Sequence, residues 1–385
     1  MKALNGIRVL DLSWLLPGPY CTMLLADMGA DVVKIEQSGK GEYTRDLHPD
    51  MFQVANRNKR SMTLNLKSAA GRAVLHKLVE SADVLIEGFR PGVMQRLGSD
   101  YATLAKINPR LIYCSISGYG QTGPYRDWPG HDIGYAGVGG AMAVPSDLKY
   151  PPIKASLPIG DLSSGMYATI AIQGALFERQ QSGQGQYLDI GIADCVAAWA
   201  GTRPLAHYLY FGEMPPTKLN ATSRVYVAQD GKRIALAVTE DHFWVRLCKV
   251  LDRADWASDP GLKDLPDRRA RNDELLAELE RMIATKPRAE WLRLCAEQDV
   301  PVAPVNDPED VFEDPQIKSR ELLWEFDDAD GRHRRIFGWP VKFGRDGPAL
   351  RHPAPAAPGC DTDAVLAEAG YAAGDIAALR AQGAF

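Results

Sequence analysis

Short apolar runs alternate with longer segments of mixed character through the first 120 residues of the chain. The runs predict strands at residues 7–12, 31–36, 62–66, 83–86 and 111–115. Helices are expected between them, for example at residues 20–28 and 69–81. Strands that alternate with helices are typical of parallel βαβ units, so the pattern predicts an open α/β sheet. Ligands bind such sheets beyond the carboxyl ends of the strands, which here are followed by the loops after Leu12, Glu36, Glu87 and Ser117.

A change of texture near Arg224 predicts a second, smaller domain. Before it, a long helix is expected at residues 163–181, followed by a strand at 186–192 and an apolar helix from Asp194. After it, two β-type runs flank Gln229-Asp230-Gly231-Lys232, which is typical of a hairpin turn, and helices then dominate. We predict a large domain over residues 1–200, a linker over 201–224 with a boundary near Lys218 to Thr222, and a small α+β domain over 225–324.

The composition is that of a globular protein. The 385 residues are 45% apolar and 24% charged, and the net charge of −5 gives no reason to expect a nucleic-acid partner. There is no run of 18 apolar residues, and Asp11, Pro17 and Gly18 interrupt the apolar N-terminus, so neither a membrane span nor a signal peptide is expected. The six cysteines form no CxxC pair, which indicates reduced thiols and a cytoplasmic location. The chain also lacks HExxH and close histidine pairs, so no metal site is predicted.

Ionisable side chains stand at the ends of several predicted elements, where loops hold functional groups on a rigid frame. The segment Glu87 to Val93 follows one strand, the glycine-rich segment Gly118 to Pro124 follows another, and Gly130-His131-Asp132 comes soon after. The pair Gly160-Asp161 opens a helix, and Glu240-Asp241-His242 opens another. These positions are the candidate functional residues.

Each candidate taken alone also has a structural interpretation. Arg90 could pair with a surface carboxylate, and His131 could be a hydrogen-bonded structural histidine. Asp161 could cap a helix, and Glu240 could be an ordinary first-turn acid. Asp132 could serve only to brace the histidine loop. The glycine-rich segment is neither GxGxxG at a helix start nor a P-loop, so it could be a simple turn.

The combination of motifs is far more specific than its parts. The matching segments are Gly6-Ile-Arg-Val-Leu-Asp-Leu12, Gly18-Pro-Tyr-Cys-Thr22, Gly29-Ala-Asp-Val-Val-Lys-Ile-Glu36, Asn56-Arg-Asn-Lys-Arg-Ser61, Gly88-Phe-Arg-Pro-Gly92, Asn108-Pro-Arg-Leu-Ile112, Ser117-Gly-Tyr-Gly-Gln-Thr-Gly-Pro124, Gly160-Asp161 and Gly183-Gln-Gly-Gln186. Together they resemble the class III CoA-transferase family, which also contains α-methylacyl-CoA racemase. The resemblance is strong over residues 1–200 and looser beyond them.

The resemblance implies a large Rossmann-like α/β domain completed by the C-terminal tail, residues 325–385, and two subunits interlocked as a homodimer. It implies that coenzyme A enters as part of an acyl-CoA substrate and that no cofactor is bound permanently. Gln37 stands where many members have an arginine for the CoA phosphates. The residues that we expect to bind CoA are Arg45, Lys59, Arg60, Phe89, Arg90 and Arg96, because phosphates need positive charge and hydrogen-bond donors.

Two activities are implied by the resemblance. In the transferases, the aspartate that matches Asp161 attacks the acyl carbonyl of the donor thioester and forms an anhydride. In the racemases, it exchanges the α-proton opposite a histidine, and donors at the thioester carbonyl stabilise the enolate. His131 stands where racemases have histidine and transferases often have tyrosine. Glu240 and Arg90 match a glutamate near that histidine and an arginine close to the site.

We therefore expect a racemase that inverts the α-carbon of a 2-methylacyl-CoA, with a CoA-transferase as the alternative. Ser163 and Ser164 depart from the glycine-rich run that follows the racemase aspartate, and transferases also carry a carboxylate at the position of Asp132. The ionisable groups retained at 131, 161 and 240 argue against a non-catalytic CoA-binding protein. The acyl group is not determined by the sequence. The expected catalytic residues are His131, Asp161, Glu240, Arg90 and Asp132.

Overall fold

The structure is a computed structural model that describes residues 2–142, 157–202, 204–213, 220–328 and 331–385. The chain forms two compact units, of which the first comprises Met1–Pro215 and Leu322–Phe385 and the second Pro216–Glu321. The predicted small domain, residues 225–324, starts nine residues later and ends three residues later than the second unit. The predicted boundary near Lys218 to Thr222 begins in residues 214–219, which lie outside the described residues.

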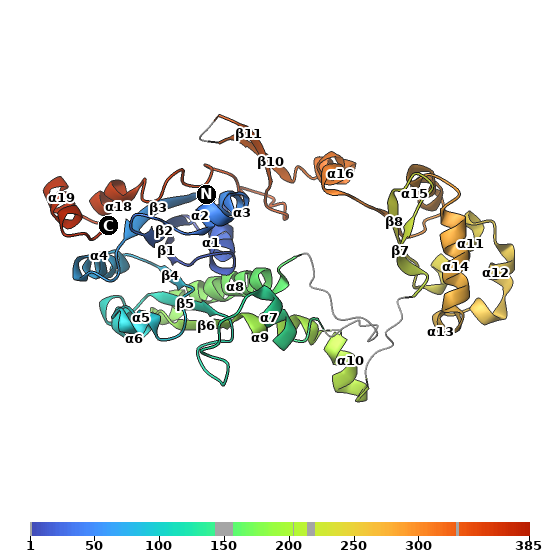
Figure 1. The fold of residues 1–385 in the computed structure, drawn as a ribbon, viewed down its shortest axis with the longest axis horizontal. Helices are drawn as coiled ribbons and strands as arrows, with labels where there is room; N and C mark the ends of the chain where they lie inside the picture. The colour runs from blue at the N-terminus through green and yellow to red at the C-terminus, as the bar shows by residue number, and fades with distance from the viewer. Residues whose placement is uncertain (1, 143–156, 203, 214–219, 329–330) are drawn as a thin grey trace. The chain divides into compact units, whose positions relative to one another are not determined.

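The first unit is built on a sheet of six parallel strands in the order β3-β2-β1-β4-β5-β6 (Figure 1). The strands are β1 (Arg8–Leu12), β2 (Asp31–Gln37), β3 (Lys59–Leu64), β4 (Val84–Glu87), β5 (Ile112–Ser117) and β6 (Tyr187–Gly191). The chain moves outward from β1 to β3, then returns and continues on the other side of β1 from β4. This reversal is the topological switch point at which open α/β sheets bind ligands. The sheet confirms the predicted α/β fold.

Helices cover both faces of the sheet. Alternate residues of a strand point to opposite faces, so Val9 belongs to one core cluster and its neighbour Leu10 to the other, and both are fully buried. The helices α1 (Pro17–Asp27) and α8 (Ile159–Ser182) pack on the Val9 face. The helices α4 (Ala69–Val79) and α6 (Tyr101–Ile107) pack on the Leu10 face. Burial on both faces explains why the strands read as continuous apolar runs.

The C-terminal tail returns to this unit and completes it. The helices α18 (Thr362–Glu368) and α19 (Ala373–Ala381) lie beside β3 and α4 (Figure 1). The amide of Asn65 donates to the carbonyl of Ala384 at 2.8 Å, and the amide of Asp361 donates to the carbonyl of Ser61 at 2.8 Å. Val365 and Leu366 extend the Leu10 core. The last residues of the chain are thus part of the same domain as the first.

The remaining elements of the first unit are short, and several carry the loops around the carboxyl ends of the strands. They are α2 (Thr44–Leu47), α3 (Pro49–Ala55), α5 (Val93–Arg96), α7 (Asp132–Val138), α9 (Ile192–Ala200), α10 (Pro204–Phe211) and the antiparallel pair β10 (Leu323–Asp327) and β11 (His333–Phe337). The predicted linker over residues 201–224 therefore contains a helix, α10.

The second unit packs helices against a small antiparallel sheet in the order β7-β8-β9. Its core includes the stacked rings of Trp244 and Trp256, whose centroids are 5.6 Å apart. The elements are β7 (Ser223–Val227), β8 (Arg233–Ala237), α11 (Asp241–Val250), α12 (Ala254–Ser258), a 3-10 turn (Pro260–Leu262), α13 (Leu265–Ala270), α14 (Asn272–Ile283), α15 (Arg288–Glu297), β9 (Val302–Val305), α16 (Pro308–Glu313) and α17 (Pro315–Ser319). In the described part of the chain, none of the helices is long and apolar enough to span a bilayer.

Candidate active site

A cavity of about 490 Å³ opens at the carboxyl ends of β1, β4 and β5. Its walls come from the loop after β1, the turn after β4, the end of β5 and the first turns of α7, α8 and α9. The cavity therefore lies at the switch point of the sheet, where the loops diverge and leave space for a ligand. This is the position that the strand pattern predicted.

Three of the predicted catalytic residues line this cavity. They are Arg90 from the turn after β4, His131 at the start of α7 and Asp161 in the first turn of α8. Arg90 and His131 are both exposed to solvent. The helix α8 begins at Ile159, four residues earlier than the predicted Ser163, so Asp161 lies inside the helix instead of before it. A carboxylate in a first helical turn is stabilised by the helix dipole.

Asp132 holds the backbone that carries Asp161. Its Oδ1 accepts the amide hydrogens of Gly160 at 2.8 Å and Asp161 at 3.3 Å. The helix α8 needs this cap from α7, because its own N-cap residue, Pro158, makes no side-chain cap. Asp132 is buried and is not part of the cavity wall. The structure thus gives Asp132 a positioning contact with α8, and its catalytic role stays a prediction.

Tyr135 forms part of the cavity wall between His131 and the glycine-rich loop. Burial raises the pKa of its hydroxyl to about 12, with further contributions from the negative charge of Asp161 and from Tyr119. It therefore remains a hydrogen-bond donor at neutral pH. A Cβ atom added to Gly118 would lie 2.4 Å from the Tyr135 ring, and one added to Gly130 would lie 2.6 Å from it. Any side chain larger than that of glycine at positions 118 and 130 would therefore displace the Tyr135 ring.

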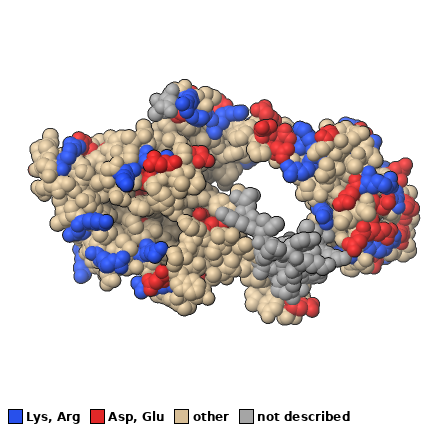
Figure 2. All heavy atoms as spheres, viewed as in Figure 1, with Lys and Arg blue, Asp and Glu red and all other residues tan. Residues whose placement is uncertain are grey.

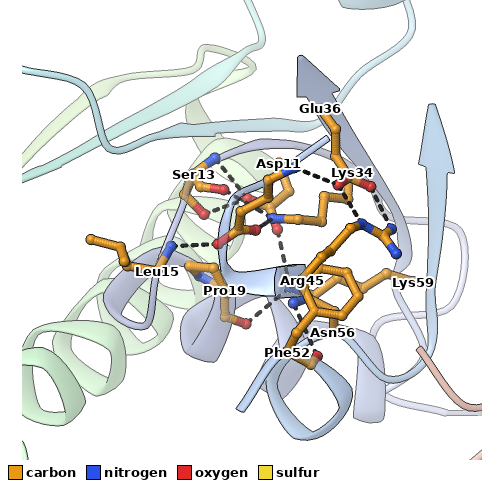
Figure 3. A network of polar contacts seen from close by, with 12 residues as sticks. Asp11, Ser13, Leu15, Pro19, Lys34, Glu36, Arg45, Phe52, Asn56 and Lys59 are labelled. Carbon is orange, nitrogen blue, oxygen red and sulfur yellow. Dashed lines mark hydrogen bonds and ion pairs between the residues drawn. The ribbon is translucent and has the colours of Figure 1, made fainter. Parts of the chain in front are cut away.

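The loop after β1 is held from below by a buried polar network (Figure 3). The carboxylate of Asp11 accepts the amide hydrogen of Ser13 at 3.0 Å, and the Lys34 ammonium donates to the carbonyl of Ser13 at 3.0 Å. The Glu42 carboxylate accepts the amide hydrogen of Leu15 at 2.5 Å. Leu15 has a left-handed backbone, with φ of 65°, and lines the cavity. The network therefore keeps a strained residue in the cavity wall.

Lys59 belongs to this network, which corrects its predicted role in phosphate binding. Its ammonium is fully buried and contacts Asp11 at 3.1 Å, the carbonyl of Pro19 at 3.0 Å and Asn56 at 2.8 Å (Figure 3). Burial lowers the pKa of Lys59 to about 8, although the charge of Asp11 opposes the shift. All three hydrogen bonds of the ammonium are thus directed into the protein.

Arg45 and Arg60 are likewise paired with carboxylates. Arg45 donates two hydrogen bonds to Glu36, at 2.8 and 2.7 Å, and stacks over Phe52 at 4.0 Å. Arg60 pairs with Asp31 and Glu368, each at 2.7 Å. Asp31 is the first residue of β2, so Arg60 lies at the amino edge of the sheet, opposite the cavity. The predicted phosphate role is therefore corrected for Arg60. For Arg45 it stays a prediction, although Nε and Nη2 of its guanidinium group are already bonded to Glu36.

Arg126 takes a place that the sequence did not predict. It lines the cavity with Arg90, and its Nη2 lies 3.7 Å from the position of a Cβ on Gly92. The Nη1 of Arg96 lies 3.4 Å from the same point, so these two guanidinium groups converge on the turn after β4. Basic side chains gather over α5 and α6 in the face of the first unit that Figure 2 shows. The glycine-rich segment that precedes Arg126 was the only sequence signal for it.

A second, more apolar cavity of about 370 Å³ lies at the carboxyl ends of β1, β2 and β3. Trp14 and Phe89 are walls of both cavities, so the two are neighbours. Ser38, just after β2, lines the second cavity and has a buried hydroxyl without a hydrogen-bond partner among the described residues. Lys67 lies on the same wall and is exposed. The apolar cavity is suited to a flat ring with polar groups at its edge.

Glu240 belongs to the second unit, where it is the N-cap residue of α11. The Thr239 hydroxyl donates to its carboxylate at 2.7 Å, and this hydrogen bond lowers the pKa of Glu240. The predicted approach of Glu240 to His131 concerns residues of different units and stays a prediction. No group of His, Cys, Asp or Glu within the described ranges is arranged to hold a metal ion.

Comparison with known proteins agrees with this architecture. The model of CoA-transferase family III matches residues 4–362. The chain is 36% identical to an acetyl-CoA:oxalate CoA-transferase of Acetobacter aceti over 96% of both chains, and 36% identical to a succinate–glutarate CoA-transferase of Agrobacterium fabrum over 85% of this chain and 86% of that one. A crystal structure of a CaiB/BaiF family protein from Brucella suis superposes with a TM-score of 0.86 at 32% identity, covering 96% of this chain and 99% of that one. With a parallel sheet, a cavity at its switch point and a match over nearly the whole chain, the protein belongs to CoA-transferase family III.

Proposed function

We propose that the protein is a CoA-transferase that moves coenzyme A between two carboxylic acids, with Asp161 as the nucleophile. The observation that carries the proposal is the position of Asp161, on the wall of the switch-point cavity and held there by Asp132. The relatives from Acetobacter aceti and Agrobacterium fabrum are both named as CoA-transferases. They support this alternative better than the racemase that the sequence motifs favoured.

The reaction needs only one nucleophilic carboxylate. An oxygen of Asp161 attacks the acyl carbon of the donor thioester, and the C–S bond breaks. The CoA thiolate departs, and an acyl–aspartyl anhydride remains on the protein. The thiolate attacks the aspartyl carbon of the anhydride, the donor acid leaves, and Asp161 carries CoA as a thioester. The acceptor carboxylate attacks this thioester carbon and releases the thiolate, which then takes the acceptor acyl group. Asp161 is regenerated as a carboxylate.

The other residues of the cavity bind and orient the ligands. Arg90 and Arg126 supply positive charge for the acid that must approach an anionic aspartate. The Tyr135 hydroxyl, which remains protonated, can donate to the oxygen on which negative charge develops. His131, which lines the same cavity, is a further hydrogen-bond donor for the ligands.

We place the adenine end of CoA in the apolar cavity beyond Trp14 and Phe89, with Ser38 and Lys67 at its edge. The phosphates then lie between the two cavities, near Arg90 and the convergent Arg96 and Arg126. Coenzyme A is thus part of the substrate, and the proposal requires no permanently bound cofactor.

A racemase remains the second candidate because His131 and Asp161 line the same cavity. Inversion of an α-carbon needs two acid–base groups on opposite faces of the substrate, and these residues could supply them. In that reaction, each variant at 131 or 161 blocks proton exchange mainly from one enantiomer. In the transferase, Asp161 is indispensable and His131 is much less so.

One experiment separates the two candidates. The protein is incubated with 2-methylacyl-CoA in D2O, and separately with acyl-CoA, a free acid and hydroxylamine. Acyl exchange and a hydroxylamine-trapped adduct on Asp161, absent from Asp161→Asn, support the transferase. Deuterium at the α-carbon together with inversion, without acyl exchange, would refute it. CoA binding by Asp161→Asn, measured by calorimetry, shows that the variant retains its site.

We also propose that the protein acts in the cytoplasm as an interlocked homodimer. The long helix α8 exposes Met166, Ile170 and Phe177, with 41%, 60% and 66% of each residue accessible. An apolar stripe of this kind is suited to burial against a second copy. Sedimentation velocity at nanomolar concentration should give a dimer, and a folded monomer there would refute the assembly.

A further inference from the structure

A third cavity, of about 370 Å³, lies on the other side of the turn that carries Arg90. Arg90 and Arg126 line both this cavity and the catalytic one. Its wall also includes the side chain of Glu87, a carboxyl group to which the reaction above gives no role. Glu87 is the last residue of β4 and is only 4% exposed.

Glu87 is fixed by hydrogen bonds that cross the sheet and close the next turn. One carboxylate oxygen, Oε2, accepts the amide hydrogen of Phe89 at 2.8 Å. The other, Oε1, accepts the hydroxyl hydrogen of Ser115, which stands opposite Glu87 in the register of β4 and β5. The Ser115 hydroxyl in turn accepts the hydroxyl hydrogen of Tyr187, on β6, at 3.1 Å.

The turn closed by Glu87 forms the partition between the three cavities. Phe89 lines the catalytic and the apolar cavity, and Arg90 lines the catalytic and the third. The two residues stand two and three positions after Glu87, so the hydrogen bond from the Phe89 amide to Glu87 sets the direction in which their side chains leave the turn. A change at Glu87 therefore acts on ligand binding without contact between Glu87 and the ligand.

We propose that Glu87 is a positioning residue for CoA thioester binding, and that the charge state of its carboxyl group controls how firmly the Phe89–Arg90 turn is held. This rests on the proposed function, because it takes the ligand of the catalytic cavity to be a CoA thioester. An ionised carboxylate accepts stronger hydrogen bonds than a neutral carboxyl group. The turn is thus held most firmly when Glu87 is charged.

The surroundings of Glu87 make its charge responsive near neutral pH. Burial raises its pKa to about 7, while the hydrogen bonds from Ser115 and the Phe89 amide oppose the shift and the charge of Asp189 adds to it. The carboxyl group therefore changes from mostly neutral to mostly ionised as the pH rises through about 7. The titratable and charged groups that face it are Tyr113 on β5, Tyr187 and Asp189 on β6, Asp100 and Tyr101 at the start of α6, and Arg90 and Arg126 from the loops.

The test measures CoA binding by calorimetry between pH 5.5 and 8.5 for the wild type, Glu87→Gln and Glu80→Gln. Glu80 is an exposed acid on the surface near α4 and serves as the matched control. We expect the dissociation constant of the wild type to fall about fivefold more than that of Glu87→Gln as the pH rises through 7, which is the difference between a charge-assisted and a neutral hydrogen bond. Ionisation of the CoA phosphates affects all three proteins equally and cancels in the ratio.

Turnover provides the second readout. We expect Glu87→Gln to raise KM above pH 7 and to leave kcat within twofold, because Glu87 touches neither Asp161 nor the ligand. Identical pH profiles for the wild type and Glu87→Gln, or a change in kcat alone, would overturn the inference about Glu87. Neither result would contradict the proposal that the protein binds CoA. Failure of the wild type to bind CoA at any pH would instead refute the proposed function.

Hydrogen exchange of the Phe89 amide in the wild-type chain keeps the inference testable if Glu87→Gln does not fold. After correction for the intrinsic exchange rate, protection of this amide should rise as the pH passes through 7. Protection that is constant from pH 6 to 8 would overturn the inference.

Discussion

The buried pair of Lys34 and Glu42 beneath the catalytic cavity allows a quantitative test of how the first unit is stabilised. The two groups are 2.5 Å apart, and both side chains are fully buried. Their network contains three acids, Asp11, Glu36 and Glu42, and three bases, Lys34, Arg45 and Lys59. Glu42→Gln keeps the shape of the side chain and an acceptor for the Leu15 amide. It leaves one uncompensated positive charge in the interior.

We expect Glu42→Gln to reduce the free energy of unfolding by about 3–5 kcal/mol, the cost of removing one partner of a buried ion pair. The double variant Lys34→Met, Glu42→Gln restores the balance of charge, with two acids and two bases left. It should lose only about 1–2 kcal/mol, from the hydrogen bond of Lys34 to Ser13 and the change in packing. The double variant should thus be more stable than the single one.

The assay is hydrogen-exchange mass spectrometry of peptides from β1 and β2. It reports the opening free energy of this unit alone, whereas the optical signal of a two-unit chain mixes two transitions. Glu80→Gln is the control, because the Lys77–Glu80 pair is 47% and 51% exposed and should contribute about 0.5 kcal/mol or less. The reasoning fails if Glu42→Gln costs no more than this control, or if the double variant is as unstable as the single one.

Three further outcomes are expected. Gly165→Ala should cost about 1–3 kcal/mol in urea unfolding, because its Cβ would lie 2.7 Å from the carbonyl oxygen of Pro17 in α1, whereas Gly374→Ala in α19, with no packing neighbour within 4 Å of its added Cβ, should not destabilise the protein; equal effects would contradict the α1–α8 contact. Arg126→Gln should weaken CoA binding about three- to tenfold in calorimetry, and Lys106→Gln on α6 should leave it unchanged; an unchanged affinity for Arg126→Gln would remove this arginine from the phosphate site. Of the six thiols, only that of Cys360 is exposed, so Ellman's reagent should titrate one thiol per native chain and six in denaturant; more than one in the native chain would indicate a more open core.

The sequence alone determined most of the secondary structure of the first unit and the place of its cavity. Apolar runs and glycine or proline breaks are local signals, so the strands from β1 to β6 lie within about three residues of their predicted ranges. Alternation of strand and helix also implied which edge of the sheet would bind a ligand. Of the loops named in this way, the one after Glu87 carries Arg90; His131 and Asp161, which line the same cavity, were grouped with it by the family resemblance and not by the strand pattern.

The tertiary structure decided which charged side chains face the cavity. Lys59 and Arg60 are adjacent in sequence, but one ammonium is buried against Asp11 and the other cation is paired with Asp31 and Glu368. Glu368 is 308 residues away from Arg60, and no local pattern predicts such a partner. The same holds for Asp132, whose carboxylate caps a helix that begins 27 residues later. A side chain's own sequence neighbourhood sets its secondary structure, but the free energy of an ion depends on the charges and solvent brought near it by the fold.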